Sequence, residues 1–281
     1  MKHPLKYLVI GAAIAATSGV ASADKANPET LRVALLPDES PQQIIKKNKP
    51  FETYLEEELG KEVKLVVTTD YSSMMEAARF DRVDLAYFGP LSYVLASKKG
   101  ADIVPFAAKM ENGEATYRSV LIANRNADVD AYADIEGKTM AYGDPASTSS
   151  HLIPKKHLIK QGVEPSDYEG RHTGSHDAVA TAVQNGHAQA GALSEPIFES
   201  LVERGIVSKD KVKVLGHSEP YPQYPWAMQT YLADDLQAKI RETFLSVDDP
   251  AILEPMGAEK LVAISDEDYA PVRELLPLLE R

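Results

Sequence analysis

The chain has 281 residues, a net charge of −12 at neutral pH and no cysteine. The acidic charge argues against nucleic acid or an anionic membrane surface as a partner. The lack of cysteine excludes disulfides, thiolate catalysis and cysteine-ligated zinc. The length is sufficient for two lobes of ordinary domain size.

The first residues predict an export signal. A basic start containing Lys2 and Lys6 leads into a short apolar run that ends at Ala21-Ser22-Ala23, which is the pattern of a secretory signal peptide. The alternative is a retained membrane anchor, but the run is too short to span a bilayer comfortably. We therefore expect residues 1–23 to be removed and the mature chain to be periplasmic. The segment carries two lysines and no acid, so the mature chain would have a net charge of −14.

Strands alternate with helices over the next hundred residues. Pro41 just after Ser40 is an expected helix start and Gly60 an expected stop, which predicts a helix between them with a kink near Pro50. Apolar runs predict strands at 31–36, 63–68, 84–89, 103–108 and 117–123, and helices are predicted after Asp70 and from Pro90 to Gly100. Such alternation is typical of βαβ units with parallel strands.

A second alternating unit follows, and the chain then returns to the first. Its strands are predicted at 139–143, 168–172, 188–193 and 212–216, and its helices at 151–161, 175–185 and 196–204. Residues 220–225 contain too many prolines for a helix or a central strand. A strand at 226–232 and helices at 234–246, 251–256 and 266–279 complete the chain. We expect a first lobe at 24–122, a second at 123–222 and a return segment at 223–281, joined by a two-segment hinge.

The most informative stretch is Asp144-Pro145-Ala146-Ser147-Thr148-Ser149-Ser150. It lies between a predicted strand and a predicted helix. The start of a helix has unpaired N–H groups and a partial positive charge. Hydroxyl donors added there make a site for a small anion. The alternative is that these serines only cap the helix.

A second helix start, at Ser175 and His176, follows a neighbouring strand of the same unit. Ligands of open α/β sheets bind at the carboxyl ends of the strands, so both starts are expected to face one crevice. His176 could donate to an anion there, or it could be an ordinary surface histidine. Three tyrosines of the first unit follow or end strands on the corresponding side and are either half-buried core residues or hydroxyl donors: Tyr71, Tyr87 and Tyr117.

Signals for an enzyme are missing. Gly137-Lys138-Thr139 resembles the end of a phosphate-binding loop, but position 132 is tyrosine where that loop requires glycine. A turn separates His172 from His176, so they do not form a stacked zinc pair. No activated nucleophile or metal set is evident, and no cofactor is expected.

The combined motifs resemble the PhnD-like family of periplasmic substrate-binding proteins of phosphonate and phosphite ABC transporters. The resemblance extends from residue 31 to about residue 273. It rests on Asp70-Tyr71, on Phe80 with Val83-Asp84-Leu85-Ala86, on Tyr117 with Ser119-Val120-Leu121-Ile122, on Gly143-Asp144-Pro145 with Ser147-Thr148-Ser149, and on Gly174 with His176.

The resemblance implies a type II periplasmic-binding-protein fold, an α/β fold of two lobes, and ligand capture without chemistry. It implies an oxyanion site at Tyr71, Tyr117, Ser147, Thr148, Ser149 and His176. Family members that bind an aminoalkylphosphonate also use acids for the amine. One of these falls near Glu195, and the other falls at Tyr224, which is not acidic.

We therefore expect a small ligand, phosphite or a short alkylphosphonate, delivered by a monomer to an ABC permease with its cytoplasmic ATPase. Phosphate would place an unpaired oxygen against aromatic rings, for which Tyr87, Tyr224 and Trp226 are candidates, at a cost of about 1–3 kcal/mol. Three alternatives stay open. They are a binding protein of the same fold for an aminoalkylphosphonate or phosphate, a ligand sensor for a membrane receptor, and an exported enzyme.

Overall fold

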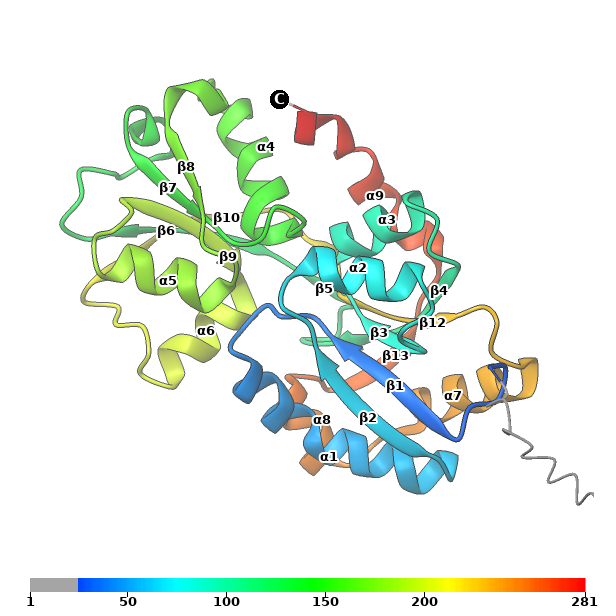
Figure 1. The fold of residues 1–281 in the computed structure, drawn as a ribbon. Helices are drawn as coiled ribbons and strands as arrows, with labels where there is room; N and C mark the ends of the chain where they lie inside the picture. The colour runs from blue at the N-terminus through cyan, green and yellow to red at the C-terminus, as the bar shows by residue number, and fades with distance from the viewer. Residues whose placement is uncertain (1–24, 281) are drawn as a thin grey trace, which may run out of the picture.

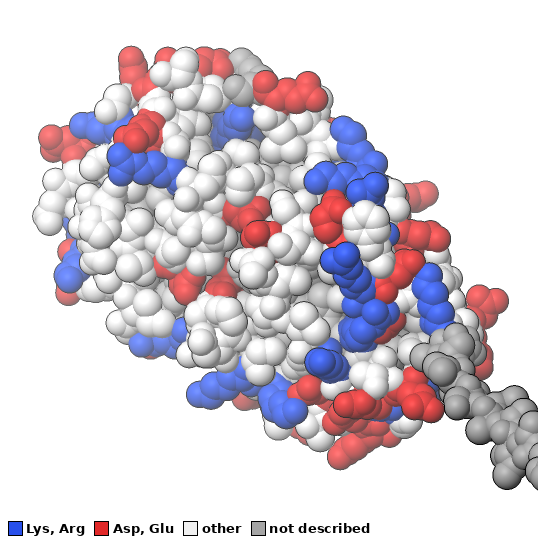
Figure 2. Space-filling model, viewed as in Figure 1, with Lys and Arg blue, Asp and Glu red and all other residues white. Residues whose placement is uncertain are grey.

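Two separate sheets, each covered by helices, organise the computed structural model, which describes residues 25–280 (Figure 1). The expected signal peptide lies outside the described residues. In the described part of the chain, no helix is both long enough and apolar enough to cross a membrane. Acidic and basic side chains are interspersed on the face shown in Figure 2, and no broad basic surface is visible there.

The first lobe contains a six-stranded sheet with the order β13-β4-β12-β3-β1-β2. Strand β1 pairs in parallel with β2 and β3, as the alternating pattern predicts. The strands are β1 (Thr30–Leu35), β2 (Glu62–Val67), β3 (Leu85–Tyr87), β4 (Ile103–Met110), β12 (Pro225–Gln229) and β13 (Lys260–Ala263). The prolines before β12 fit the rule that proline is confined to strand starts and edges, because Pro225 is the first residue of this central strand.

The helices of this lobe begin and end at recognisable signals. Gly60 ends the first of them with a left-handed backbone (φ 65°), which glycine adopts without strain. The Asp70 carboxylate caps the second by accepting from Ser73 N at 2.6 Å. The helices are α1 (Pro41–Leu59), α2 (Tyr71–Arg79), α3 (Pro90–Lys98), α7 (Asp234–Ser246), α8 (Pro250–Met256) and α9 (Ala270–Arg273).

The second lobe contains a five-stranded sheet with the order β10-β6-β9-β7-β8. Strands β7, β8 and β9 are parallel. The strands are β6 (Ser119–Asn124), β7 (Thr139–Tyr142), β8 (Glu169–His172), β9 (Ala190–Ser194) and β10 (Val212–His217). The short helices η1 (Tyr132–Ile135) and η3 (Pro165–Asp167) lie in loops, and the longer elements are η2 (Thr148–Leu152), α4 (Ile153–Lys160), α5 (His176–Gln184) and α6 (Glu195–Glu203).

The chain passes between the lobes twice. Short strands β5 (Thr116–Tyr117) and β11 (Tyr221–Pro222) pair antiparallel at the crossing. The strand after each crossing, β6 in one sheet and β12 in the other, is inserted antiparallel between its neighbours. The expected boundary at residue 122 falls inside β6, which belongs to the second sheet.

Two features of the return segment differ from the sequence-based expectation. The sequence-based expectation does not include strand β13, because its four residues at a sheet edge give too short a pattern to recognise. The single helix expected at 266–279 is three short pieces: η4 (Asp266–Tyr269), α9 and η5 (Leu276–Glu280). Pro271 and Pro277 explain the interruption, since proline cannot donate within a helix and favours the first turn.

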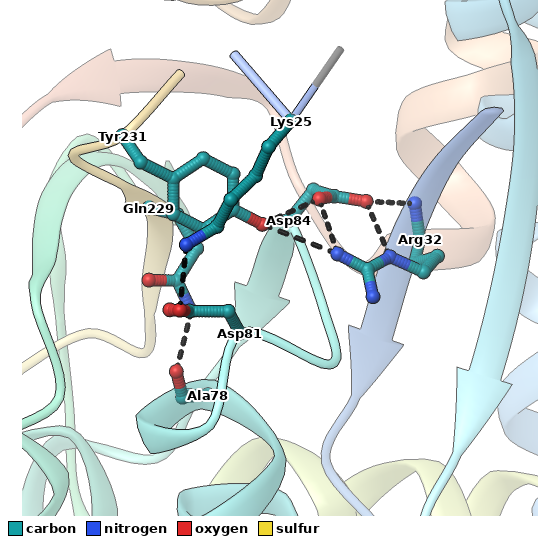
Figure 3. Close-up of polar contacts among 7 residues, drawn as sticks. All are labelled: Lys25, Arg32, Ala78, Asp81, Asp84, Gln229 and Tyr231. Atoms are coloured by element: carbon teal, nitrogen blue, oxygen red, sulfur yellow. Dashed lines mark hydrogen bonds and ion pairs between the residues drawn. The ribbon is translucent and has the colours of Figure 1, made fainter. Parts of the chain in front are cut away.

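A buried carboxylate next to β3 ties β1 to the sheet (Figure 3). Asp84 is 1% exposed and accepts from Arg32 N at 2.7 Å, Arg32 Nη2 at 2.7 Å and Tyr231 Oη at 2.7 Å. Asp84 is one of the residues on which the family resemblance rests. Its contacts are structural, because they satisfy the carboxylate entirely within the first lobe.

Candidate functional site

The carboxyl ends of the parallel strands of both lobes face each other, and four contacts join them. Tyr71 N donates to Asp144 Oδ2 (3.4 Å), and Leu91 N donates to Thr148 Oγ1 (2.8 Å). His176 N donates to the Asp38 carbonyl (2.9 Å), and Arg204 Nη1 contacts Glu39 Oε1 (2.9 Å). Four helix starts therefore lie where the lobes meet: those of α2, α3, η2 and α5. The sequence led us to expect the last two of these to face one crevice. Converging helix starts bring positive partial charge to one place.

The serine-rich stretch forms a tight turn that opens a helix. Ser147 caps η2 by accepting from Ser150 N at 3.1 Å, and Leu152 N donates to Ser147 O at 3.1 Å, the spacing of a π-helical turn. Such turns are frequent at functional sites. Gly143 is required beside it, because a Cβ at that position would lie 2.8 Å from Ser150 Oγ.

The hydroxyls of this stretch divide into two kinds. Ser150 Oγ accepts from Gly143 N at 2.8 Å and donates to the Ala192 carbonyl, so it is fully used within the lobe. Ser149 Oγ is buried and has no hydrogen-bond partner among the described residues. Thr148 Oγ1 accepts from Leu91 N, so its own proton stays available for a third group.

A second unpartnered hydroxyl lies beside them. Tyr117 is 4% exposed, and its Oη has no hydrogen-bond partner among the described residues. Burial raises the phenol pKa, and nearby Ser149 and Thr148 partly offset that rise. A buried hydroxyl without a partner costs about 1–3 kcal/mol. Two such groups close together indicate a place where a ligand completes the hydrogen bonding.

His176 occupies the first turn of α5 and is 1% exposed. Ser194 N donates to its Nδ1 at 3.3 Å, and its Nε2 lies 3.3 Å from Tyr224 Oη. Burial lowers the His176 pKa to about 4, so the ring is neutral at neutral pH. With Nδ1 accepting, Nε2 carries the proton and donates to Tyr224. Tyr224 then has its own O–H free to donate to a ligand.

Tyr71, at the start of α2, is 1% exposed. Burial raises its phenol pKa far above the usual range, and the Ser147 side chain partly offsets this rise. The structure therefore brings Tyr71 to Ser147, Tyr117 to Thr148 and Ser149, and His176 to Tyr224. Asp144 of the same motif caps the turn by accepting from Ala146 N at 2.7 Å.

An aromatic wall adjoins these hydroxyls. The Tyr224 ring lies 5.1 Å from the Tyr117 ring and 5.6 Å from the Tyr87 ring. Trp226 lies 4.8 Å from Tyr87 and also packs on Phe51 and Phe244 in the core. Tyr224 is therefore the member of the wall that touches the hydroxyl set, and Trp226 lies behind it.

A cleft of about 300 Å³ lies between the lobes. Lobe 1 lines it with Asp38, Glu39, Lys47 and Lys109, among others, and lobe 2 lines it with Ser194 at the end of β9 and with one side of α6. Tyr87, Tyr224 and Trp226 are part of its lining, whereas the expected oxyanion residues are not: Tyr71, Tyr117, Ser147, Thr148, Ser149 and His176. Glu195, expected as an amine ligand, does not line the cleft either, and its carboxylate lies 3.1 Å from His217 Nε2.

Sequence reasoning missed two participants in this site. Leu91 N comes from the start of α3, which the Gly89-Pro90 signal predicted without assigning it a role. Asp38 lies between the strand predicted at 31–36 and the helix predicted from Pro41, and the sequence gives it no role, although it follows the carboxyl end of β1, where the same rule places ligands. Among residues 25–280, no group of three or more His, Cys, Asp or Glu side chains could hold a metal ion.

The fold and the site define a class: a two-lobed binding protein with a hinge and an enclosed polar site between the lobes. Residues 33–269 match the model of the family described as ABC transporter, phosphonate, periplasmic substrate-binding protein. The chain belongs to this family, which confirms the resemblance drawn from the motifs.

Similar proteins agree. The chain is 29% identical to the phosphate-import protein PhnD of Mycolicibacterium smegmatis, over 88% of this chain and 84% of that one. A binding protein component of an ABC phosphonate transporter from Pseudomonas aeruginosa superposes with a TM-score of 0.82 at 25% identity, covering 89% of this chain and 86% of that one. PhnD1 from Prochlorococcus marinus, solved with methylphosphonate, gives 0.83 at 22% identity, covering 90% and 99%.

These matches confirm the type II periplasmic-binding-protein fold. They also place the chain among the substrate-binding proteins of ABC transporters and not among enzymes.

Proposed function

We propose that this chain is the periplasmic solute-binding component of an ABC importer and captures phosphite or a small alkylphosphonate. The lobes close on the ligand, and the closed protein delivers it to the permease and its ATPase. The observation that carries the proposal is the pair of buried, unpartnered hydroxyls, Tyr117 Oη and Ser149 Oγ, beside converging helix starts.

The donor set suits a tetrahedral oxyanion. Ser147, Thr148 and Ser149 take its oxygens from lobe 2, with Tyr71 from lobe 1 and Tyr117 from the crossing strand β5. His176 acts through Tyr224, which it holds by a hydrogen bond. Every one of these groups is neutral, so the site binds an anion by hydrogen bonds and helix dipoles.

Closure follows from where the donors come from. A ligand that touches Thr148 of one lobe and Tyr71 of the other makes both contacts only when the lobes meet. It therefore has a higher affinity for the closed conformation and shifts the population toward it. Micromolar binding requires about 8 kcal/mol, which several hydrogen bonds to a charged ligand can supply.

The aromatic wall supports a ligand with one face that makes no hydrogen bond. Phosphite has a P–H bond there and methylphosphonate a P–CH₃ group. Phosphate would place an oxygen against the ring face of Tyr87 or Tyr224 and not at the Tyr224 hydroxyl, at a cost of about 1–3 kcal/mol, or roughly 10- to 100-fold in affinity. The absence of an acid at Tyr224 and the contact of Glu195 with His217 give no support for an amine at these positions.

Calorimetry of the mature chain against phosphite, methylphosphonate, 2-aminoethylphosphonate and phosphate tests the proposal. We expect phosphite or methylphosphonate to bind at least tenfold more tightly than phosphate. Equal or tighter binding of phosphate, which the name of the mycobacterial relative makes the main competitor, would contradict the role of the wall. No binding of any of the four would overturn the proposed function.

A further inference from the structure

Asp38 is held at the meeting point of the two lobes. It follows the carboxyl end of β1, its half-buried side chain lines the cleft, and its carbonyl accepts from His176 N at 2.9 Å. This hydrogen bond therefore holds the Asp38 backbone at the start of α5.

The cations near Asp38 form ion pairs with neighbouring acids. Glu39 is 6% exposed and contacts both Lys47 and Arg204, which together keep its pKa low against the effect of burial. Lys109 lies 3.5 Å from Glu111. For Asp38 burial is the larger effect and the charge of Glu39 adds to it, so its pKa is raised to about 7. Asp38 is thus a carboxyl at the cleft that forms no ion pair among residues 25–280.

The same carboxyl lines the cleft together with Tyr87 and Tyr224. Burial is the main cause of the raised phenol pKa values of Tyr71, Tyr87, Tyr117 and Tyr224, and the charge of Asp38 adds to the rise in each case. A carboxylate beside an oxyanion is repulsive unless a proton lies between them. Phosphorus oxyanions can supply that proton, since their second ionisation falls near neutral pH (about 6 for a phosphate monoester).

We propose that the Asp38 carboxyl is part of the ligand site and shares one proton with the bound phosphorus oxyanion. A singly protonated ligand donates its P–OH to the carboxylate, and no bond other than this hydrogen bond forms. When the ligand arrives fully ionised, the shared proton is taken from solvent. This inference rests on the proposed function and adds the protonation state of the ligand and a residue that selects it.

The other titratable and charged groups around Asp38 fit this assignment. The tyrosines have raised pKa values and stay neutral, and His176 is neutral because its pKa is lowered to about 4. The remaining groups are paired with one another, Glu39 with Lys47 and Arg204, and Lys109 with Glu111. The set is Glu39 on the same segment, Lys47 on α1, Tyr71 on α2, Tyr87 on β3, Lys109 and Glu111 on and after β4, Tyr117 on β5, His176 on α5, Arg204 after α6 and Tyr224 before β12. The lining of the cleft adds three acids, Glu199 and Glu203 on α6 and Glu254 on α8.

The experiment is calorimetric titration of methylphosphonate at pH 7, 8 and 9, each in two buffers with different ionisation enthalpies. We expect the wild type to take up about one proton per ligand at pH 9, and its affinity to fall about tenfold per pH unit above pH 8. In Asp38→Asn the amide keeps the shape and supplies its own donor. Its uptake should be near zero, and its affinity should be nearly flat over this range. Asp248→Asn, which removes an exposed acid that does not line the cleft, should behave as the wild type.

Three outcomes would overturn the inference. They are binding by the wild type at pH 9 without proton uptake, an unchanged pH slope in Asp38→Asn, and a loss confined to 2-aminoethylphosphonate, which would make Asp38 an amine ligand. The wild-type uptake needs no variant, so the test holds even where Asp38→Asn fails to fold. If the wild type binds none of the phosphorus oxyanions at pH 7, the proposed function itself fails.

Discussion

Two carboxylates on either side of β1 show how this molecule separates folding from binding. Asp84 contacts β1 at Arg32, inside the first lobe, and is enclosed by Arg32 and Tyr231. Asp38 follows the other end of β1, lines the cleft and forms no ion pair with the residues that the structure describes. The paired acid stabilises the sheet, and we propose that the acid without an ion pair takes part in binding.

The same contrast separates two adjacent serines. Ser150 uses its hydroxyl fully, with Gly143 and Ala192, and so shapes the turn. Ser149, one residue earlier, is just as buried but leaves its hydroxyl without a partner. In this pair the serine that is satisfied within the lobe supports the fold, whereas the unsatisfied one lies beside Tyr117, where the chain crosses between the lobes.

The largest expected effect is on the hydroxyl set itself. Ser147→Ala combined with Thr148→Val removes two donors to the ligand, and we expect at least a tenfold loss of affinity for methylphosphonate by calorimetry, and up to about 100-fold. Thr181→Val, at an exposed position on α5, is the control and should leave the affinity unchanged. An unaltered affinity in the double variant would remove the proposed site.

Next in size is the effect of Asp84→Asn. It leaves Arg32 with a weakened partner, and we expect a loss of about 2 kcal/mol in the free energy of unfolding, measured by urea denaturation. The affinity for ligand should stay within a factor of two, because Asp84 acts only through the first lobe. A large loss of affinity with normal stability would contradict the contrast between the two acids.

The two serines provide a reciprocal test of similar size. Ser150→Ala should lower the free energy of unfolding by about 1–3 kcal/mol, because Gly143 N loses its acceptor. Ser149→Ala removes a buried hydroxyl that has no partner, so it should raise the free energy of unfolding of the ligand-free protein by about 1–3 kcal/mol and weaken binding about tenfold. Thermal unfolding and calorimetry on both variants check these roles. A loss of affinity in Ser150→Ala together with a loss of stability in Ser149→Ala would contradict them.

Much of this arrangement could be predicted from sequence. The alternation of strands and helices gave the two lobes, and the Ser147–Ser149 stretch and His176 were correctly expected at neighbouring helix starts. His176 was expected to contact the ligand directly. Its contact with Tyr224 could not be predicted, because the two residues are 48 positions apart in the sequence. Asp38 could not be distinguished from a turn residue, since its lack of a counterion depends on Glu39 drawing Arg204 from the other lobe.

A smaller effect is expected on stability in Asp38→Asn. Its folded pKa of about 7 lies above the unfolded value of about 3.9. The folded state therefore binds more protons between these values, and the protein loses stability as pH rises through that window. Asparagine removes the loss, so we expect the variant without ligand to melt a few degrees higher at pH 8 and no higher below pH 4. A lower melting temperature at pH 8 would show that the Asp38 carboxylate is stabilised by a charged partner in the folded protein.

The smallest effect concerns the contact between the lobes. Arg204→Gln breaks the ion pair with Glu39, which is partly exposed on the arginine side and so is worth about 0.5–1 kcal/mol. We expect a two- to fivefold weaker affinity, with a larger radius of gyration in small-angle scattering of the unliganded protein. Lys213→Gln breaks an exposed pair within lobe 2 and serves as the control. Equal effects of the two variants would argue against a role in closure.

The most direct measurement is a crystal structure of the mature chain with methylphosphonate. We expect the phosphonate oxygens to lie within about 3.2 Å of Tyr117 Oη and Ser149 Oγ, with the methyl group against the ring face of Tyr224. A ligand found only in the outer part of the cleft along α6, with both hydroxyls still unpartnered, would contradict it.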